Sequence, residues 1–269
     1  MVDIGSDFRT LHEAENPFII PNPWDIGTAK LLASLGFKAL ATTSAGFAFS
    51  RGLPDGGVVF EDMMDHCREI VAATPLPVSA DLEHGKGDSP DSAAETIFAA
   101  EAAGLAGCSI EDATGDRENP IYDFSQAVER VSAAAEAARA LKRDFVFTAR
   151  AENFLHGRPD LFDTIARLPA FEKAGADVLY APGLTDISQV RAICEAVSRP
   201  VNVLAIAEFS VPALAAAGVS RISVGSKLTN LAFGAVQRAA GEMLGDGTFT
   251  FARDVMPFAR LQEMFSENE

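Results

Sequence analysis

The chain has 269 residues, 48% of them hydrophobic, and its 38 acidic and 22 basic residues give a formal net charge of −16. This composition is sufficient for a large core, and the acidic balance argues against nucleic acid or an anionic membrane as a main partner. The start, MVDIGSDFRT, lacks the basic and apolar regions of a signal peptide, and no segment approaches the roughly 20 apolar residues of a membrane span. We therefore expect a cytoplasmic protein.

Eight short apolar or β-branched runs alternate with amphipathic helical patterns along the chain. The predicted strands are 17–21, 38–44, 76–82, 107–112, 145–150, 177–182, 200–204 and 221–226. The predicted helices are 27–35, 61–73, 89–103, 123–141, 160–174, 185–198, 209–217 and 228–244. Several of these helices end in a glycine that fits the left-handed position after a helix, namely Gly36, Gly104, Gly175 and Gly218. Strict alternation predicts an α/β fold, a single (β/α)8 TIM-type barrel over 1–245, with a C-terminal helical extension over 246–269.

The three cysteines are far apart and form no CxxC pair, so neither a zinc site nor a disulfide framework is predicted. Cys67 and Cys108 lie in apolar surroundings. We interpret the cysteines as buried structural thiols of a protein in a reducing compartment.

The carboxyl ends of the strands of such a barrel meet at one mouth, where its active site forms. The predicted strand ends bring together Trp24, Asp25, Ser44, Ala45, Gly46, Asp81, Glu83, Glu111, Asp112, Arg150, Glu152, Pro182, Gly183, Asn202, Gly225 and Ser226. Four or five carboxylates around one arginine would repel one another, and a divalent cation is the simplest way to reconcile them. The alternative is structural: these acids cap helices or form salt bridges across loops.

Asp81 and Glu83 stand at i and i+2 of a strand and therefore share one face. Gly85 and Gly87 follow at once and let the backbone turn away. With Glu111 on the next strand the ligands are all oxygen, which favours Mg²⁺ or Mn²⁺ over Zn²⁺.

Several segments together resemble the isocitrate lyase/phosphoenolpyruvate mutase superfamily over about residues 16 to 240. SADLEHGKGD (79–88) and CSIEDATG (108–115) resemble its metal-binding core, and ATTSAGFAFSRGLPDG (41–56) resembles its substrate loop. FTARAENF (147–154) and AGADVLYAPGLTD (174–186) are similar to its elements on the fifth and sixth strands.

The resemblance implies a role for each matching residue. Asp81, Glu83 and Glu111 would form the shell of a Mg²⁺ (or Mn²⁺) ion, and Asp55 would reach the water shell of that ion. Backbone N–H and hydroxyl groups of Ser44, Ala45 and Gly46 would bind a substrate carboxylate, and Arg150 would pair with the substrate anion. The implied catalytic residues are Arg150, Asp55 and Glu111, acting on an enolate of a 2-oxo acid. From their places at strand ends, Trp24 and Asn202 are added as candidate substrate contacts.

One departure concerns the loop after the fourth strand, residues 113–123. The lyases of the superfamily that cleave isocitrate and methylisocitrate carry a Lys-(Lys/Arg)-Cys-Gly-His element there, whereas this loop has no Cys, His or Lys. Cys108 lies inside the preceding strand and cannot replace a loop residue. We interpret the loop as a lid. Its only candidates for direct chemistry are Arg117, Glu118, Asn119 and Tyr122, and we favour the interpretation that each is a solvated loop residue.

These observations favour a Mg²⁺-dependent lyase of a small 2-oxo or 2-hydroxy di- or tricarboxylate, with decarboxylation or hydrolysis of an oxaloacetate-type substrate as the preferred variant. The alternatives are a phosphonate P–C hydrolase or mutase and a non-catalytic barrel that binds a carboxylate. A third is a phospho-sugar aldolase, with phosphate at Gly225 and Ser226 and a Schiff base on Lys227. The resemblance also implies a homotetramer in which the last barrel helix is exchanged between subunits.

Overall fold

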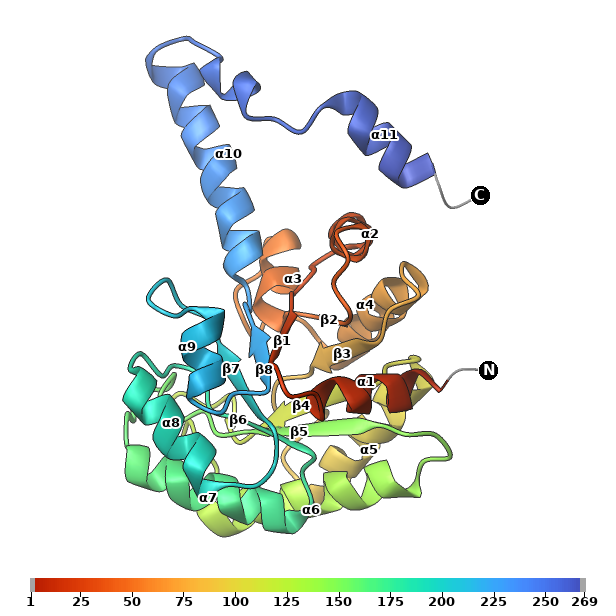
Figure 1. Ribbon diagram of the computed structural model, residues 1–269, viewed down its shortest axis with the longest axis vertical. Helices are drawn as coiled ribbons and strands as arrows, with labels where there is room; N and C mark the ends of the chain where they lie inside the picture. The colour runs from red at the N-terminus through yellow and green to blue at the C-terminus, as the bar shows by residue number, and fades with distance from the viewer. Residues whose placement is uncertain (1–2, 267–269) are drawn as a thin grey trace.

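The computed structural model of the protein describes residues 3–266. Eight parallel strands form one sheet in the order β1-β8-β7-β6-β5-β4-β3-β2, as Figure 1 shows. Their bounds are β1 (Phe18–Ile20), β2 (Leu40–Ala41), β3 (Val78–Asp81), β4 (Gly107–Glu111), β5 (Val146–Arg150), β6 (Val178–Tyr180), β7 (Val201–Leu204) and β8 (Arg221–Ser223). Each lies within the corresponding predicted strand.

The first and second strands bring the two edges of the sheet together. Between them, the backbone N–H of Ala41 donates to the carbonyl of Pro21 at 3.1 Å. The amide of Asn22 donates to the carbonyl of Thr42 at 3.0 Å. The predicted barrel is therefore present in a nearly closed form.

Most of the helices lie around the outside of this sheet, whereas the last ones extend away from it (Figure 1). Their bounds are α1 (Ile4–His12), α2 (Ile26–Ser34), α3 (Ser44–Ser50), α4 (Phe60–Ala72), α5 (Pro90–Ala102), α6 (Phe124–Ala140), α7 (Leu161–Ala174), α8 (Ile187–Ala196), α9 (Val211–Ala216), α10 (Lys227–Gly245), the short 3-10 helix η1 (Thr250–Arg253) and α11 (Phe258–Ser266). The eight predicted barrel helices correspond to α2 and α4–α10. Helices α1 and α3 are additions that the hydrophobic pattern did not indicate.

Helix α1 closes the amino-terminal end of the barrel. Phe8 is fully buried and packs in one cluster with Val146 and Val178 at the starts of their strands. Beside it, Arg9 bonds the carboxylates of Asp144 at 2.7 Å and Asp177 at 2.8 Å. The opposite end, where the strands finish, is left open for a site.

The predicted strand 38–44 is too long. Strand β2 ends at Ala41, and helix α3 begins at Ser44. The Thr43 side chain caps this helix by accepting a hydrogen bond from the backbone N–H of Gly46 at 3.2 Å. Ser44 and Ala45 are thus the first residues of a helix that starts at the barrel mouth.

Two smaller predictions on the core are confirmed. Gly36, Gly104, Gly175 and Gly218 have φ of +91°, +87°, +111° and +91°, in the left-handed region that a side chain would strain. Cys67 and Cys108 are fully buried, and Cys194 is partly buried. Burial raises the pKa of the Cys67 thiol to about 12.

Helix α10 extends away from the barrel, and the chain then returns through η1 to α11 near α2 (Figure 1). Thr229 is its one buried residue, whereas Leu231, Phe233 and Val236 are 62%, 53% and 68% exposed. Within residues 3–266, none of the helices combines the length and the apolar character that crossing a membrane requires.

Candidate active site

A pocket of about 180 Å³ opens where the strands end. Six of the predicted site residues line it, namely Ser44, Ala45, Asp55, Asp81, Arg150 and Asn202. They come from β3, β5 and β7, from the start of α3 and from the loop after α3. The fold therefore brings together residues that lie up to 158 positions apart in the sequence, as the barrel prediction required.

Arg150 is the centre of the charge network of the pocket. Its guanidinium bonds the Asp81 carboxylate, lies 3.0 Å from Glu111 Oε2 and donates from Nε to Glu152 Oε1 at 2.8 Å. The same group stacks over the ring of Tyr180, 5.3 Å from its centroid. Three carboxylates therefore face one guanidinium, which is only 11% exposed.

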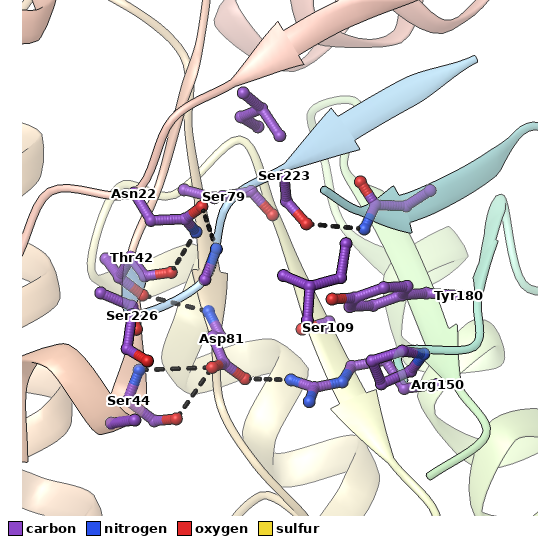
Figure 2. A pocket seen from close by; sticks show the side chains of 18 of the residues that line it. Asn22, Thr42, Ser44, Ser79, Asp81, Ser109, Arg150, Tyr180, Ser223 and Ser226 are labelled. Atoms are coloured by element: carbon purple, nitrogen blue, oxygen red, sulfur yellow. Dashed lines mark hydrogen bonds and ion pairs between the residues drawn. The ribbon is translucent and has the colours of Figure 1, made fainter. Parts of the chain in front are cut away.

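Asp81 is held between the start of α3 and Arg150, as Figure 2 shows. Its Oδ2 accepts from the Ser44 hydroxyl at 2.8 Å and from the Ser44 backbone N–H at 3.3 Å. The Asp81 backbone N–H donates to the Thr42 hydroxyl at 3.0 Å. These contacts fix the carboxylate toward the pocket.

Burial and mutual repulsion raise the pKa of the neighbouring acids. The pKa of Glu83 is raised to about 7, mainly by burial and then by the charges of Asp81 and Asp55. Burial also raises the pKa of Glu111 well above its ordinary value, although Arg150 opposes this. Asp55 shifts in the same direction through burial and Asp81. Clusters of acids whose pKa is raised by one another are typical of sites that bind cations or transfer protons.

Glu83 has a backbone φ of +51°, which is uncommon for a residue other than glycine. Its carbonyl accepts a hydrogen bond from the backbone N–H of Glu111 at 2.9 Å. The turn after β3 is thus bonded to β4, and it places a carboxylate at the barrel mouth at the cost of local strain.

The chemistry of these donors fits a hard divalent cation, because all of the predicted ligands are carboxylates. In this structure the guanidinium of Arg150 lies between Asp81 and Glu111 and compensates their charge. Among residues 3–266, the group of three possible ligands with atoms within 4.8 Å of one another is Glu111, Glu152 and His156, which shares only Glu111 with the predicted shell. Glu152 is among the strand-end residues predicted at the mouth, but it is not among the predicted metal ligands.

Two predicted substrate contacts lie elsewhere. Gly46 does not line the pocket: a Cβ there would lie 2.5 Å from Thr229 Oγ1, so the glycine permits α3 to pack against α10. Its N–H is used by the Thr43 cap. Trp24 is half-buried just before α2 and also lies outside the pocket lining.

The lid loop 113–123 is folded back on itself. Ala113 and Ile121 form an antiparallel bridge, and Thr114 N–H donates to the carbonyl of Pro120 at 3.0 Å. The predicted solvated positions Arg117, Glu118 and Asn119 are exposed.

The same prediction is wrong for Tyr122, which is only 5% exposed. Its hydroxyl donates to Asp88 Oδ1 at 2.6 Å, and Arg130 lies 4.6 Å over its ring. An aromatic ring at the end of a loop is stabilised by burial, and this one anchors the lid to α6.

The pocket also contains residues that strand ends alone did not identify, among them Asn22, Tyr180, Arg221 and Ser223. Asn22 Oδ1 accepts from the backbone N–H groups of Val224 and Gly225, both at 2.9 Å. These are groups that the aldolase alternative needs for phosphate, and Lys227 is not part of the pocket lining. The geometry therefore does not favour the aldolase.

Residues 8–244 match the family model described as phosphoenolpyruvate phosphomutase. The 2-methylisocitrate lyase of Escherichia coli (strain K12) is 30% identical over 205 residues, which are 73% of this chain and 68% of that protein.

Two solved structures have the same architecture over nearly their whole length. A lyase/mutase candidate from Burkholderia cenocepacia J2315 is 54% identical, with a TM-score of 0.96 over 98% of this chain and 96% of that one. An oxaloacetate acetylhydrolase in complex with its product oxalate is 26% identical, with a TM-score of 0.86 over 98% of this chain and 94% of that one.

Proposed function

This chain belongs to the phosphoenolpyruvate mutase/isocitrate lyase superfamily, and from that premise we propose that it is a Mg²⁺-dependent lyase of a small 2-oxo or 2-hydroxy di- or tricarboxylate. The reaction would break a C–C bond, by cleavage, decarboxylation or hydrolysis, and pass through an enolate. The observation that carries the proposal is the network of Arg150 with the carboxylates of Asp81, Glu111 and Glu152 beside a small pocket that Asp81 and Arg150 line.

Each site residue has a role in this proposal. Asp81, Glu83 and Glu111 would hold Mg²⁺ or Mn²⁺, which when bound supplies positive charge to the oxygens on which negative charge develops. Arg150 would bind the substrate carboxylate and, with Tyr180 stacked beneath it, keep that anion oriented.

Three further residues complete the pocket in this proposal. Ser44 fixes the Asp81 carboxylate and lines the pocket together with Ala45. Asp55 lines it from the loop after α3, and the raised pKa of its carboxyl suits a group that holds or moves a proton.

Decarboxylation or hydrolysis is the variant we favour. Isocitrate-type cleavage in the superfamily uses a loop cysteine as acid and base, and the lid 113–123 has none. Cys108 is fully buried in β4 and does not line the pocket, and burial raises the pKa of its thiol, so it is not a substitute. The relative that holds oxalate, an oxaloacetate acetylhydrolase, is consistent with a hydrolytic reaction on a C4 dicarboxylate.

A second candidate is cleavage or rearrangement of a P–C bond in a phosphonate. It is favoured by the family model that the chain matches over residues 8–244, which is named for a phosphomutase. A third candidate is a barrel that binds a carboxylate without catalysis. A substrate screen distinguishes the three candidates.

We further propose that α10 packs on a partner subunit in a homotetramer, with residues 1–245 as the catalytic barrel and 246–269 as a helical extension. The support is the apolar surface of α10, where Leu231, Phe233, Val236 and Leu244 are all more than half exposed. Apolar patches of this kind commonly mark protein interfaces.

The test is a screen for release of pyruvate, oxalate or phosphate from 2-oxo acids, malates, methylcitrates and phosphonates, with and without Mg²⁺. Asp81→Asn removes the central carboxylate charge and should abolish turnover, whereas Asp91→Asn on the exposed start of α5 is the matched control and should not. Turnover of a carboxylate supports the lyase, and turnover of a phosphonate supports the second candidate. If the wild type shows no turnover above Asp81→Asn on any substrate, the protein is a binding barrel.

A further inference from the structure

The inside of this barrel is polar beneath the acidic mouth. Barrel interiors are usually filled by layers of Val, Ile and Leu. Here the pocket lining includes Ser79, Ser109, Asn202, Arg221 and Ser223 beside apolar residues such as Ile20 and Leu204. Figure 2 shows Ser79, Ser109 and Ser223 around the same space as Tyr180. Such a well can receive a polar part of a ligand.

The register of the strands shows that the residues of this inner pocket and those of the mouth lie on the same inward face of the sheet. Glu111, Arg150, Tyr180, Asn202 and Arg221 are successive register partners on β4, β5, β6, β7 and β8. Register partners in a barrel point to the same side of the sheet, so all five face inward. Arg150 and Arg221 are therefore two cations of one pocket, separated by the Tyr180 and Asn202 positions.

The two arginines differ in their partners. Arg150 bonds three carboxylates, whereas the hydrogen bonds of Arg221 all go to neutral groups. Nε donates to Asn202 Oδ1 at 2.9 Å, Nη1 to His12 Nε2 at 3.2 Å and Nη2 to Thr148 Oγ1 at 3.0 Å. Within residues 3–266 it has no carboxylate at salt-bridge distance, although it is only 5% exposed. A buried charge without a counter-ion is costly, and such charges are normally paired.

The groups around Arg221 supply no negative charge. His12 Nδ1–H donates to the carbonyl of Phe8 at 2.9 Å, so its Nε2 accepts from Arg221 and the ring is neutral. Burial and the charge of Arg221 lower the pKa of His12 to about 3, in agreement with this tautomer. Burial raises the pKa of Tyr180 to about 12, which keeps its hydroxyl protonated at neutral pH. Arg221 itself stays charged, because burial lowers its pKa only to about 10.

Arg221 also has free donors. A guanidinium carries five N–H groups, and three of those of Arg221 have acceptors among the described residues. One N–H on Nη1 and one on Nη2 remain without an acceptor among these residues, and both can donate to an anion in the pocket. Ser223, whose hydroxyl accepts from Asn202 at 3.0 Å, lines the pocket next to them.

We propose that Arg221 is the anchor of a second anion subsite, which binds the carboxylate at the far end of the substrate. The inference rests on the proposed function, since the near carboxylate would lie at Arg150 and the metal ligands. The substrate class then narrows to short dicarboxylates with an anionic group at each end. A monocarboxylate would leave the Arg221 charge uncompensated and bind more weakly.

The experiment compares ligands that differ only in the far carboxylate, by calorimetric titration of the full chain with Mg²⁺ in chloride-free buffer. The pairs are malate with 2-hydroxybutyrate, and 2-oxoglutarate with 2-oxopentanoate. Oxalate, whose two carboxylates are adjacent, reports on the mouth alone. A hydrogen-bonded charge pair corresponds to roughly 10- to 100-fold in affinity, so the wild type should prefer at least one diacid by about tenfold or more.

Arg221→Gln should reduce this preference to about onefold, and Arg221→Lys should keep part of it, while the affinity for oxalate stays within about twofold. If the wild type binds both members of each pair equally, the proposal is wrong, whether or not the variants fold. If the diacids and monoacids bind equally and chloride binds tightly, the site holds an inorganic anion and not a substrate carboxylate. This result also contradicts the proposal. A retained diacid preference without Mg²⁺-dependent oxalate binding or turnover would refute the proposed function and leave the subsite standing.

Discussion

Arg150 on β5 bonds the carboxylate of Asp81 on β3 across β4, and Glu111 at the end of β4 lies 3.0 Å from the same guanidinium. Three adjacent strands thus each contribute one charged end to a single cluster. The cluster is buried enough that removing its one cation leaves carboxylates without a partner, which makes its contribution measurable.

Replacing Arg150 by Met should destabilise the protein by about 3–5 kcal/mol, the usual effect of breaking a buried ion pair from one side. The double variant Arg150→Met/Glu111→Gln should recover part of this loss, because the buried carboxylate is then neutral. Urea unfolding of the four proteins in this cycle measures the coupling. Additive single effects would mean that the two side chains do not stabilise each other.

Substrate turnover should show whether the positive charge at position 150 is sufficient or whether the shape of the guanidinium is also required. Lysine keeps the charge of Arg150 but lacks the planar fork whose three nitrogens each reach a different carboxylate, so Arg150→Lys should fold and yet lose about 10²-fold or more in kcat/KM. Steady-state kinetics on the substrate found in the screen provide the measurement. Activity close to that of the wild type would show that a simple positive charge is sufficient.

The close contact of α3 with α10 should not tolerate a side chain at Gly46. A Cβ there would lie 2.5 Å from both Thr229 Oγ1 and Thr43 Cγ2, so Gly46→Ala should destabilise by about 1–3 kcal/mol despite the better helix propensity of alanine. Adding Thr229→Ala should relieve part of the clash. A stabilised Gly46→Ala protein, judged by thermal unfolding, would contradict this packing.

The strand ends were the reliable part of the sequence. Asp81, Glu111 and Arg150 could be placed in one cluster because parallel barrel strands all finish at the same mouth, and each stands directly after an apolar run. The i+2 spacing of Glu83 to Asp81 was a weaker guide, because β3 ends at Asp81 and Glu83 lies in the following turn with a φ of +51°, outside the pocket lining. These inferences need only the period of the strand and its last residue.

Residues inside the barrel were missed for a physical reason. Strand 221–226 was interpreted at its end, where Gly225 and Ser226 suggested a phosphate site, although Arg221 and Ser223 have the alternation of inward-facing positions. A charged residue at an inward-facing position of a barrel strand, here Arg221, is the sequence feature that could have predicted a polar pocket inside the barrel. Helix α3 was missed because a seven-residue helix is too short to show a 3.6-residue period.

Metal removal should lower stability if the carboxylate cluster binds Mg²⁺. A ligand present at 100 times its dissociation constant stabilises the folded state by about 2.7 kcal/mol, so Mg²⁺ should raise the midpoint of thermal unfolding and a chelator should reverse it. Asp81→Asn should lose this response, whereas Asp91→Asn should keep it. An equal response in both variants would place the metal elsewhere, for example at Glu111, Glu152 and His156.

Acid should weaken the fold through His12. Its pKa is lowered from 6.5 to about 3, so below pH 6.5 the unfolded chain binds a proton that the folded chain does not. The contribution of His12 to the free energy of unfolding is therefore complete above pH 6.5 and falls by up to about 1.4 kcal/mol per pH unit below it.

The His12→Gln variant isolates this contribution, because glutamine can still accept from Arg221 but does not titrate. The difference in free energy of unfolding, wild type minus variant, should be about 2 kcal/mol smaller at pH 5 than at pH 7.5. The carboxyl groups with raised pKa values affect the pH dependence of stability with the opposite sign. They are present in both proteins, so their contribution cancels when the difference is taken. A difference that does not change with pH would show that the pKa of His12 is not lowered in the folded protein.

The apolar surface of α10 should determine the oligomeric state. If this helix packs on a partner, Phe233→Glu/Val236→Glu places two charges in that interface, and light scattering after size exclusion should give a lower mass than for the wild type. Phe162 on α7 is 87% exposed and serves as the matched control, so Phe162→Glu should leave the mass unchanged. The same low mass for the wild type and both variants would mean that α10 is exposed in solution and that exchange of this helix does not occur. Circular dichroism at the same concentration ensures that the mass reports assembly and not unfolding.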